Sequence, residues 1–152
     1  MSIESQLSEA LRRIAPVFLR LALGRAFLSA VADRFGLWGP AGTKNASWGD
    51  FAHFMQYTAQ LNPWAPAALI PMLAWASTVA ELVLGVLLIL GLFTGWAALL
   101  SGILLLIFAG GMSIGTGLKS ALNYSVFSAA AAAFALVVLG AGPWSVDSWR
   151  GN

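Results

Sequence analysis

The chain has 152 residues, of which 59% are hydrophobic and only 9% are charged, and its mean hydropathy is +0.81. A typical soluble domain carries about 25% charged residues, so eight basic and six acidic side chains could not cover the surface of a soluble fold of this size. The composition therefore excludes an ordinary soluble domain and predicts one membrane domain over residues 1–152, surrounded mainly by the lipid bilayer.

Rare residue types narrow the chemistry further. The chain has no cysteine, which excludes disulfides, thiol relays and iron–sulfur ligation. Its single histidine, His53, excludes bis-histidine haem and ordinary zinc sites within one chain, so no metal site is expected. The basic residues form no run or stripe, which excludes a nucleic-acid binder. Any electron transfer would therefore use a quinone or another separately held cofactor, or occur on a partner.

The first apolar stretch covers residues 14–37 and is long enough to cross a bilayer. It carries Arg20 and Arg25 in its interior, and Asp33 and Arg34 near its end. A signal peptide would place small residues such as Ala30 after an apolar core, but the interior arginines argue against cleavage here. We therefore expect this stretch to be a retained membrane span.

A polar insertion of residues 38–66 follows the first span. Ser47 and Asp50 resemble a capping box, and apolar residues then recur at helical spacing while His53 falls toward the opposite face. The pattern predicts a short amphipathic helix over residues 47–61 that lies on the membrane surface.

The second stretch, residues 67–92, contains Glu81 in an otherwise almost wholly apolar sequence. A carboxylate at that depth costs about 3 kcal/mol even on lenient insertion scales, so it is expected to face a partner or a cavity. Counting residues from the predicted span ends places Glu81 level with Arg25 and within reach of Arg20. We therefore predict an intramembrane ion pair between Glu81 and one of these arginines. The pair either clamps two spans together or lines a functional cavity.

Two further stretches, residues 96–116 and 121–141, complete the expected fold. A short turn over residues 91–95 makes the second and third spans antiparallel neighbours. The prediction is an all-α, transmembrane four-helix bundle with one interfacial helix. Small residues such as Gly111 and Gly115 favour close helix packing, either within the chain or across a homodimer seam.

An even number of spans places both termini on one side of the membrane. That side would hold Arg12, Arg13 and Arg150, against Lys44 and Lys119 on the other, so the positive-inside rule slightly favours cytoplasmic termini. The tryptophans divide between the two expected interfaces: Trp38, Trp48 and Trp64 on one side, and Trp96, Trp144 and Trp149 on the other.

Polar residues near the mouth of the predicted bundle outline a candidate quinone or ligand pocket. Glu81 would set its polar interior, together with Arg20 and Arg25. The remaining candidates are His53, Tyr57, Trp64, Asn123 and Tyr124. His53 could equally be a solvated surface histidine, and Asn123 with Tyr124 offers only a weak hydrogen-bonding signal. No catalytic residue can be assigned.

Three segments resemble the DoxX family of bacterial membrane proteins: residues 19–24, residues 81–99, and the closing Gly-x-Gly-Pro-Trp-Ser-x-Asp of residues 140–147. The resemblance implies a four-helix bundle in the inner membrane. It also implies an association with quinone-linked oxidoreduction, because this family is related to the membrane subunit of a thiosulfate:quinone oxidoreductase. Arg20 and Glu81 match the family's charged positions. Residues 30–34 depart from its usual Gly-x-x-Lys, with Arg34 as the basic residue.

The preferred hypothesis is a membrane subunit that works with a quinone-linked redox protein, as a partner either in the membrane or at its surface. The alternatives are a non-catalytic accessory or scaffold subunit of a larger membrane complex, and a small transporter that uses Glu81 as a proton site. Missing inverted repeats and broken helices weaken the transporter hypothesis.

Overall fold

The computed structural model describes residues 3–151, and in that part of the chain every regular element is a helix. The prediction of an all-α fold is therefore confirmed. The elements in chain order are α1 (Ile3–Arg34), α2 (Phe51–Leu61), η1 (Ala67–Leu69), α3 (Ile70–Leu90), α4 (Thr94–Gly115), α5 (Leu118–Asn123), α6 (Val126–Leu139) and α7 (Val146–Trp149).

Three helices are long and apolar enough to cross a membrane: α1, η1 continued by α3, and α4. Their apolar side chains face lipid, and the helical backbone satisfies its own hydrogen bonds there. The protein is thus a multi-pass membrane protein. The predicted second and third spans agree with these helices to within about two residues. The first does not, because α1 begins at Ile3 rather than at residue 14 and stops at Arg34.

The predicted continuous fourth span over residues 121–141 is wrong. The chain breaks at Tyr124 and Ser125, where Ser125 adopts a left-handed backbone with φ of 56°. The remaining apolar helix, α6, has 14 residues and extends about 21 Å, which is less than the roughly 30 Å of hydrocarbon. The bundle therefore contains three long helices and one short one.

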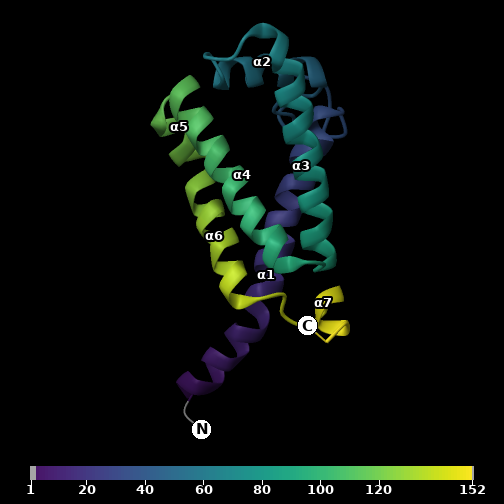
Figure 1. Ribbon diagram of the computed structural model, residues 1–152, viewed down its shortest axis with the longest axis vertical. Coiled ribbons are helices and arrows are strands. Elements are labelled where there is room, and N and C mark those ends of the chain that lie inside the picture. Colours follow the sequence, from purple (N-terminus) through teal and green to yellow (C-terminus); the bar gives the residue numbers. More distant parts are fainter. Residues whose placement is uncertain (1–2, 152) are drawn as a thin grey trace.

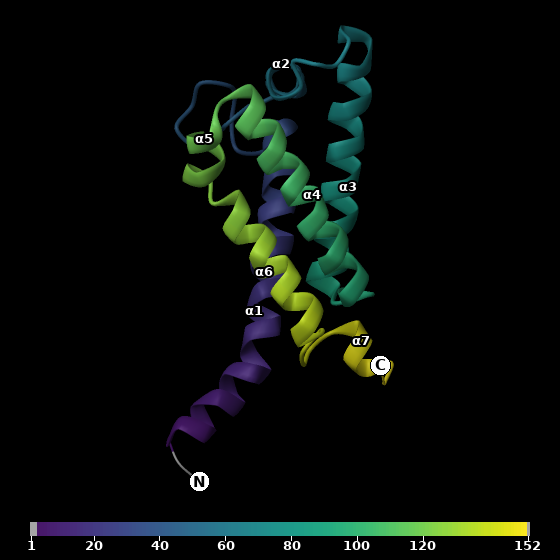
Figure 2. The same cartoon turned by 60° about the vertical axis from the view of Figure 1, so that its left-hand side comes forward.

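The helices form two pairs that diverge from a common end. α1 packs mainly against α3, and α4 packs mainly against α6. The turn between α3 and α4 lies near α7, at the end of the molecule from which the first turns of α1 project, and we call this end the α7 end (Figure 1). At the opposite end, which we call the α2 end, α2 lies across the space between the pairs (Figures 1 and 2).

Glycines allow the closest helix contacts. A Cβ at Gly24 in α1 would meet the carbonyl oxygen of Gly85 in α3 at 2.9 Å, so this pair depends on both small residues. Gly111 and Gly115, expected to pack against another span or another copy, instead receive Leu61 at the C-terminal end of α2. The small residues of α4 therefore hold α2 in place.

The interfacial helix begins later than predicted. Its N-cap is Asp50, whose carboxylate accepts a hydrogen bond from the backbone N–H of His53 at 2.8 Å. The predicted capping box starting at Ser47 is wrong, because the backbone N–H of Ser47 binds Asp33 of α1 instead. α2 thus covers residues 51–61.

The C-terminal segment closes the α7 end. The Asp147 carboxylate accepts hydrogen bonds from the backbone N–H groups of Phe93 and Thr94 at 2.9 and 2.8 Å, which caps the start of α4. The N–H of Asp147 donates to the carbonyl of Gly91. The distinctive closing motif therefore has a structural role, since it fastens the chain end to the α3–α4 turn.

Candidate functional site

Asp33, near the end of α1, holds the loop that leads to α2. Its buried carboxylate accepts three backbone N–H groups, from Ser47 at 2.9 Å, Trp48 at 3.0 Å and Gly49 at 3.4 Å. Three such bonds satisfy a buried carboxylate without an ionic partner. They also fix the position of Trp48 beside the next residue of α1.

The next residue of α1, Arg34, forms a buried ion pair with Glu81 of α3. Its Nη2 lies 2.6 Å from Glu81 Oε1, and the two side chains are only 3% and 2% exposed. Nη1 donates to the hydroxyl of Thr78 at 2.8 Å. The guanidinium carbon lies 3.7 Å from the ring centroid of Phe54 and 5.3 Å from that of Trp48. One cation therefore joins α1, α2 and α3.

The prediction that Arg20 or Arg25 pairs with Glu81 is wrong. Arg20, Gly24, Phe27, Val31 and Arg34 recur at helical spacing and form the buried face of α1. Arg25 falls outside this face and is exposed. The sequence prediction missed Arg34 because it measured depth from residue 14, whereas α1 begins at Ile3 and ends at Arg34. Arg34 lies on the same buried helical face as Gly24, which made it a further candidate.

Arg20 is buried at the α7 end, far along α1 from Glu81. Its Nη2 donates to the carbonyl oxygen of Trp144 at 3.0 Å, and its guanidinium lies directly against Gly91. Among the described residues, its Nε and Nη1 have no hydrogen-bond partner. Arg20 therefore fastens the C-terminal segment instead of neutralising Glu81.

A cavity of about 1420 Å³ lies beneath α2, between the two diverging helix pairs. Arg34 and Glu81 form part of its wall, so the ion pair borders open space. Residues from α1, α3, α4 and α6 line its sides. Its apolar lining includes Leu23, Phe27, Leu104, Leu105, Phe108 and Met112, and its polar lining includes His53, Gln56, Tyr57, Thr58, Gln60, Asn62, Ser77 and Tyr124.

Of the eight residues predicted to outline a pocket, the cavity brings together four, Glu81, His53, Tyr57 and Tyr124, and neither Arg20 nor Arg25 is among them. Trp64 and Asn123 do not line it. Trp64 follows α2 and is exposed, and Asn123 ends α5 with its side chain exposed. The sequence prediction missed Arg34, Ser77 and the α2 glutamines, because it did not foresee that α2 covers the space between the pairs.

The α2 side of the cavity carries an oriented histidine. His53 Nδ1 lies 2.8 Å from Asp50 Oδ2, which leaves Nε2 as the second ring nitrogen available for a ligand. Hydrogen bonds from the His53 backbone and side chain lower the pKa of Asp50. Burial raises the pKa of the Tyr57 phenol, so this group is a neutral hydrogen-bond donor at physiological pH.

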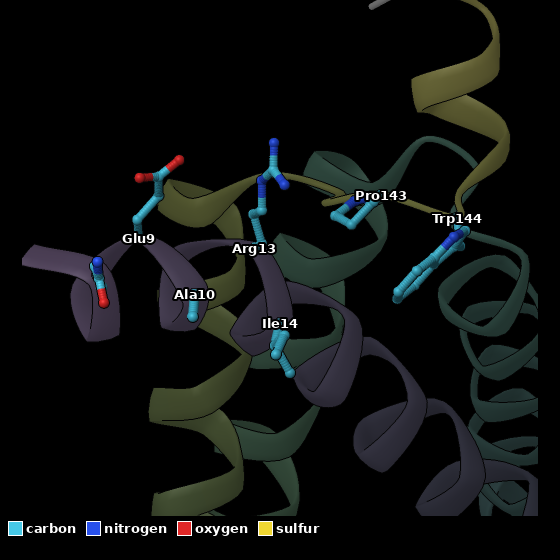
Figure 3. Close-up of a pocket in the computed structure, with 7 residues that line it drawn as sticks. Glu9, Ala10, Arg13, Ile14, Pro143 and Trp144 are labelled. Carbon is cyan, nitrogen blue, oxygen red and sulfur yellow. The ribbon is translucent and has the colours of Figure 1, made fainter. Parts of the chain in front are cut away.

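A second, shallower groove of about 700 Å³ lies outside the bundle at the α7 end. It runs between the first turns of α1 and residues 143–144, with Glu9 and Arg13 beside Pro143 and Trp144 (Figure 3). Its lining is mostly apolar and brings together no further titratable groups. Within residues 3–151, no group of three or more His, Cys, Asp or Glu could hold a metal ion.

Residues 12–125 match the model of one membrane protein family, described as methylamine utilisation protein MauE. The chain belongs to the MauE family. The matched region contains Arg34, Glu81 and all of α2, so it includes most of the cavity lining, and only the part contributed by α6 lies outside it. No curated protein and no solved structure matches the chain.

The family match overturns the resemblance to DoxX, because the matching model is MauE and no DoxX model matches. Apolar, glycine-rich spans are common to many membrane families, since the bilayer imposes them. The closing motif of residues 140–147, which carried most of the resemblance, lies outside the matched region, and in the structure it caps α4.

Proposed function

We propose that this MauE-family protein is a membrane-embedded accessory component of a methylamine-utilisation redox system, and that its cavity binds a quinone. The family name supports the biological setting. The absence of cysteine from the sequence supports an accessory role, because the chain offers no thiol redox group of its own. In this proposal the protein lies in the bacterial inner membrane with cytoplasmic termini, and α6 completes a fourth crossing.

The cavity beneath α2 is the observation that carries the quinone proposal. A quinone has a ring with two carbonyl acceptors and an apolar tail. The apolar walls between the helix pairs suit the tail. The polar end supplies hydrogen-bond donors for the carbonyls, namely His53 and Tyr57.

The test measures binding of a ubiquinone analogue to the purified protein in lipid nanodiscs, by quenching of tryptophan fluorescence. Ala129→Phe fills part of the cavity from α6, and Ala131→Phe is the matched control on an exposed face of the same helix. We expect Ala129→Phe to weaken binding at least tenfold and Ala131→Phe to leave it unchanged. Equal binding by both variants, or none by the parent protein, would refute the quinone proposal.

The accessory role is tested in the natural host. Removing the protein should abolish growth on methylamine while growth on other carbon sources continues, and mild detergent should extract the protein together with a redox partner. Full partner turnover with Glu81→Gln, together with failed quinone binding, would favour a scaffold without a ligand. Normal growth on methylamine without the protein would contradict the accessory role itself.

A further inference from the structure

Arg25 is an exposed arginine within the membrane-spanning part of α1. It lies off the buried helical face that contains Gly24 and Phe27, and its side chain is exposed. Within residues 3–151 it forms no hydrogen bond and no ion pair. The two nearest arginines on either side of it in α1, Arg20 and Arg34, are both buried and bonded.

Contacts along α1 fix the depth of Arg25. Its neighbour Gly24 packs against Gly85 and Ile89 of α3, whereas Arg20 lies against Gly91 at the α3–α4 turn. Five residues of helix, or about 7.5 Å, therefore separate Arg25 from the level of that turn. At this depth the guanidinium either extends along α1 toward the interface at the α7 end or pairs with a counter-charge from another molecule.

The surface beside Arg25 also differs from the rest of the lipid-facing exterior. Its exposed neighbours on α1 are Leu21 and two small residues, Ala22 and Ala26, of which Ala26 also borders the cavity beneath α2. The exposed faces of α3 and α4 carry large side chains instead, such as Val83 and Ile107. Small residues let another helix approach closely within the bilayer. Contact with a lipid headgroup would need only the reach of the arginine and not a flat helix surface.

A second copy of this chain does not supply the missing carboxylate. Glu4 and Glu9 lie in the first turns of α1, far from the level of Arg25, and the other acids of the spanning helices, Asp33 and Glu81, are buried and already bonded. A symmetric contact through this face would place Arg25 opposite Arg25. A carboxylate that pairs with Arg25 inside the bilayer would therefore have to come from a different protein.

We propose that the α1 face formed by Ala22, Arg25 and Ala26 binds a transmembrane helix of a partner protein, through an intramembrane Asp or Glu that pairs with Arg25. This inference rests on the proposed accessory role, which requires a partner, but it is independent of quinone binding. Arg25 would recognise a single carboxylate on an otherwise apolar partner helix. That carboxylate would lie about five residues deeper in the bilayer than the interface at the α7 end.

The direct test uses a synthetic apolar helix of about 20 residues with one Glu at that depth, and the same peptide with Gln. Because the chain has no cysteine, Lys44→Cys gives one labelling site for energy transfer in phosphatidylcholine vesicles. We expect the Glu peptide to bind at least tenfold more tightly than the Gln peptide. Arg25→Gln should abolish that preference, and Arg25→Lys should retain part of it.

Equal binding of the two peptides, or a preference that survives Arg25→Gln, would overturn the proposal. So would enrichment of phosphatidylglycerol by Arg25 without a preference for the Glu peptide, because that result assigns the residue to lipid. Thermal stability of the isolated protein provides a second measurement. Arg25→Gln should leave the unfolding midpoint unchanged or higher, and a clear decrease would show a partner within the chain and refute the inference.

Discussion

Arg34 is the residue on which the α2 end of the protein depends. Its guanidinium contacts Glu81 and Thr78 of α3 and the ring of Phe54 of α2. The preceding residue, Asp33, binds the loop before α2 through three backbone N–H groups. Loss of the Glu81 carboxylate would therefore disturb both the packing of α1 on α3 and the cover of the cavity.

Glu81→Ala should destabilise the protein by about 3–5 kcal/mol, because it leaves the buried Arg34 without its counter-charge. Thermal unfolding in detergent measures the effect. The exchange Arg34→Glu with Glu81→Arg should recover part of the loss, whereas Arg20→Glu with Glu81→Arg should not, since Arg20 contacts Trp144. A stability unchanged by Glu81→Ala would contradict the role of the ion pair.

At the scale of the element, α2 is held at both ends. Phe54 lies over Arg34, and Leu61 lies against Gly111 and Gly115 of α4. A Cβ at Gly115 would meet the carbonyl oxygen of Gln60, whereas one at Gly110 has nothing within 4 Å. The two glycines thus provide a matched pair of positions on one helix.

Gly115→Ala should loosen α2, because the added Cβ would overlap backbone atoms of Gln60 and Leu61, which cannot rotate away as the end of a flexible side chain can. Gly110→Ala should be neutral or stabilise α4 by up to about 1 kcal/mol through helix propensity. Hydrogen exchange of the α2 amides should accelerate in Gly115→Ala alone. Equal exchange rates in both variants would show that α2 is not fastened by this contact.

The cap of α4 should make stability depend on pH. Burial alone would raise the pKa of Asp147, but hydrogen bonds from Thr94 and Phe93 outweigh it and hold the pKa below its ordinary value of 3.8. A carboxylate with a lowered folded pKa stabilises the fold above its unfolded pKa, and this contribution disappears as pH falls through the folded pKa.

Asp147→Asn should therefore lower the free energy of unfolding by roughly 1 kcal/mol at pH 7, as expected for loss of a cap. The difference from the parent protein should shrink as pH falls below about 3.8. Thermal unfolding across this pH range measures it, with Glu4→Gln in the exposed first turn of α1 as the control. A difference that is constant with pH would contradict the capping role.

The sequence predicted the positions of the long helices better than the contacts between their side chains. Long apolar runs predicted α3 and α4 because the bilayer requires about 20 apolar residues in a helix. The break at Ser125 was missed because no proline or glycine marks it. The partner of Glu81 was missed because residue counting gives depth only when the ends of a helix are known. The face that Arg34 shares with Gly24 would have excluded Arg25 and left Arg20 and Arg34 as the candidates.

At the scale of the whole molecule, two helix pairs meet at the α7 end and separate toward α2 (Figure 1). This arrangement leaves the cavity between them. Neither the divergence of the helix pairs nor the cavity could be predicted from composition, because the same apolar helices could equally pack as a closed bundle. The difference arises from α2, which separates the pairs, and from the short α6.

Spin labels can test this divergence. One pair of labels at Met72 and Ile114 reports on the α2 end, and another at Leu90 and Trp96 reports on the α7 end, all at exposed side chains. We expect a broader distance distribution at the α2 end, and a narrower one there after a ubiquinone analogue is added. Equal widths at both ends, unaffected by the analogue, would contradict a divergent bundle with a ligand site.

The divergence of the pairs also means that the protein occupies unequal areas of the two leaflets. Its cross-section is narrow in the leaflet around the α7 end and wide in the leaflet around α2 (Figure 1). A tapered inclusion of this kind matches a curved bilayer better than a flat one. The protein should therefore concentrate where the leaflet that contains the α2 end forms the convex face of a curved membrane, and lipids that change spontaneous curvature should alter how widely the cavity opens.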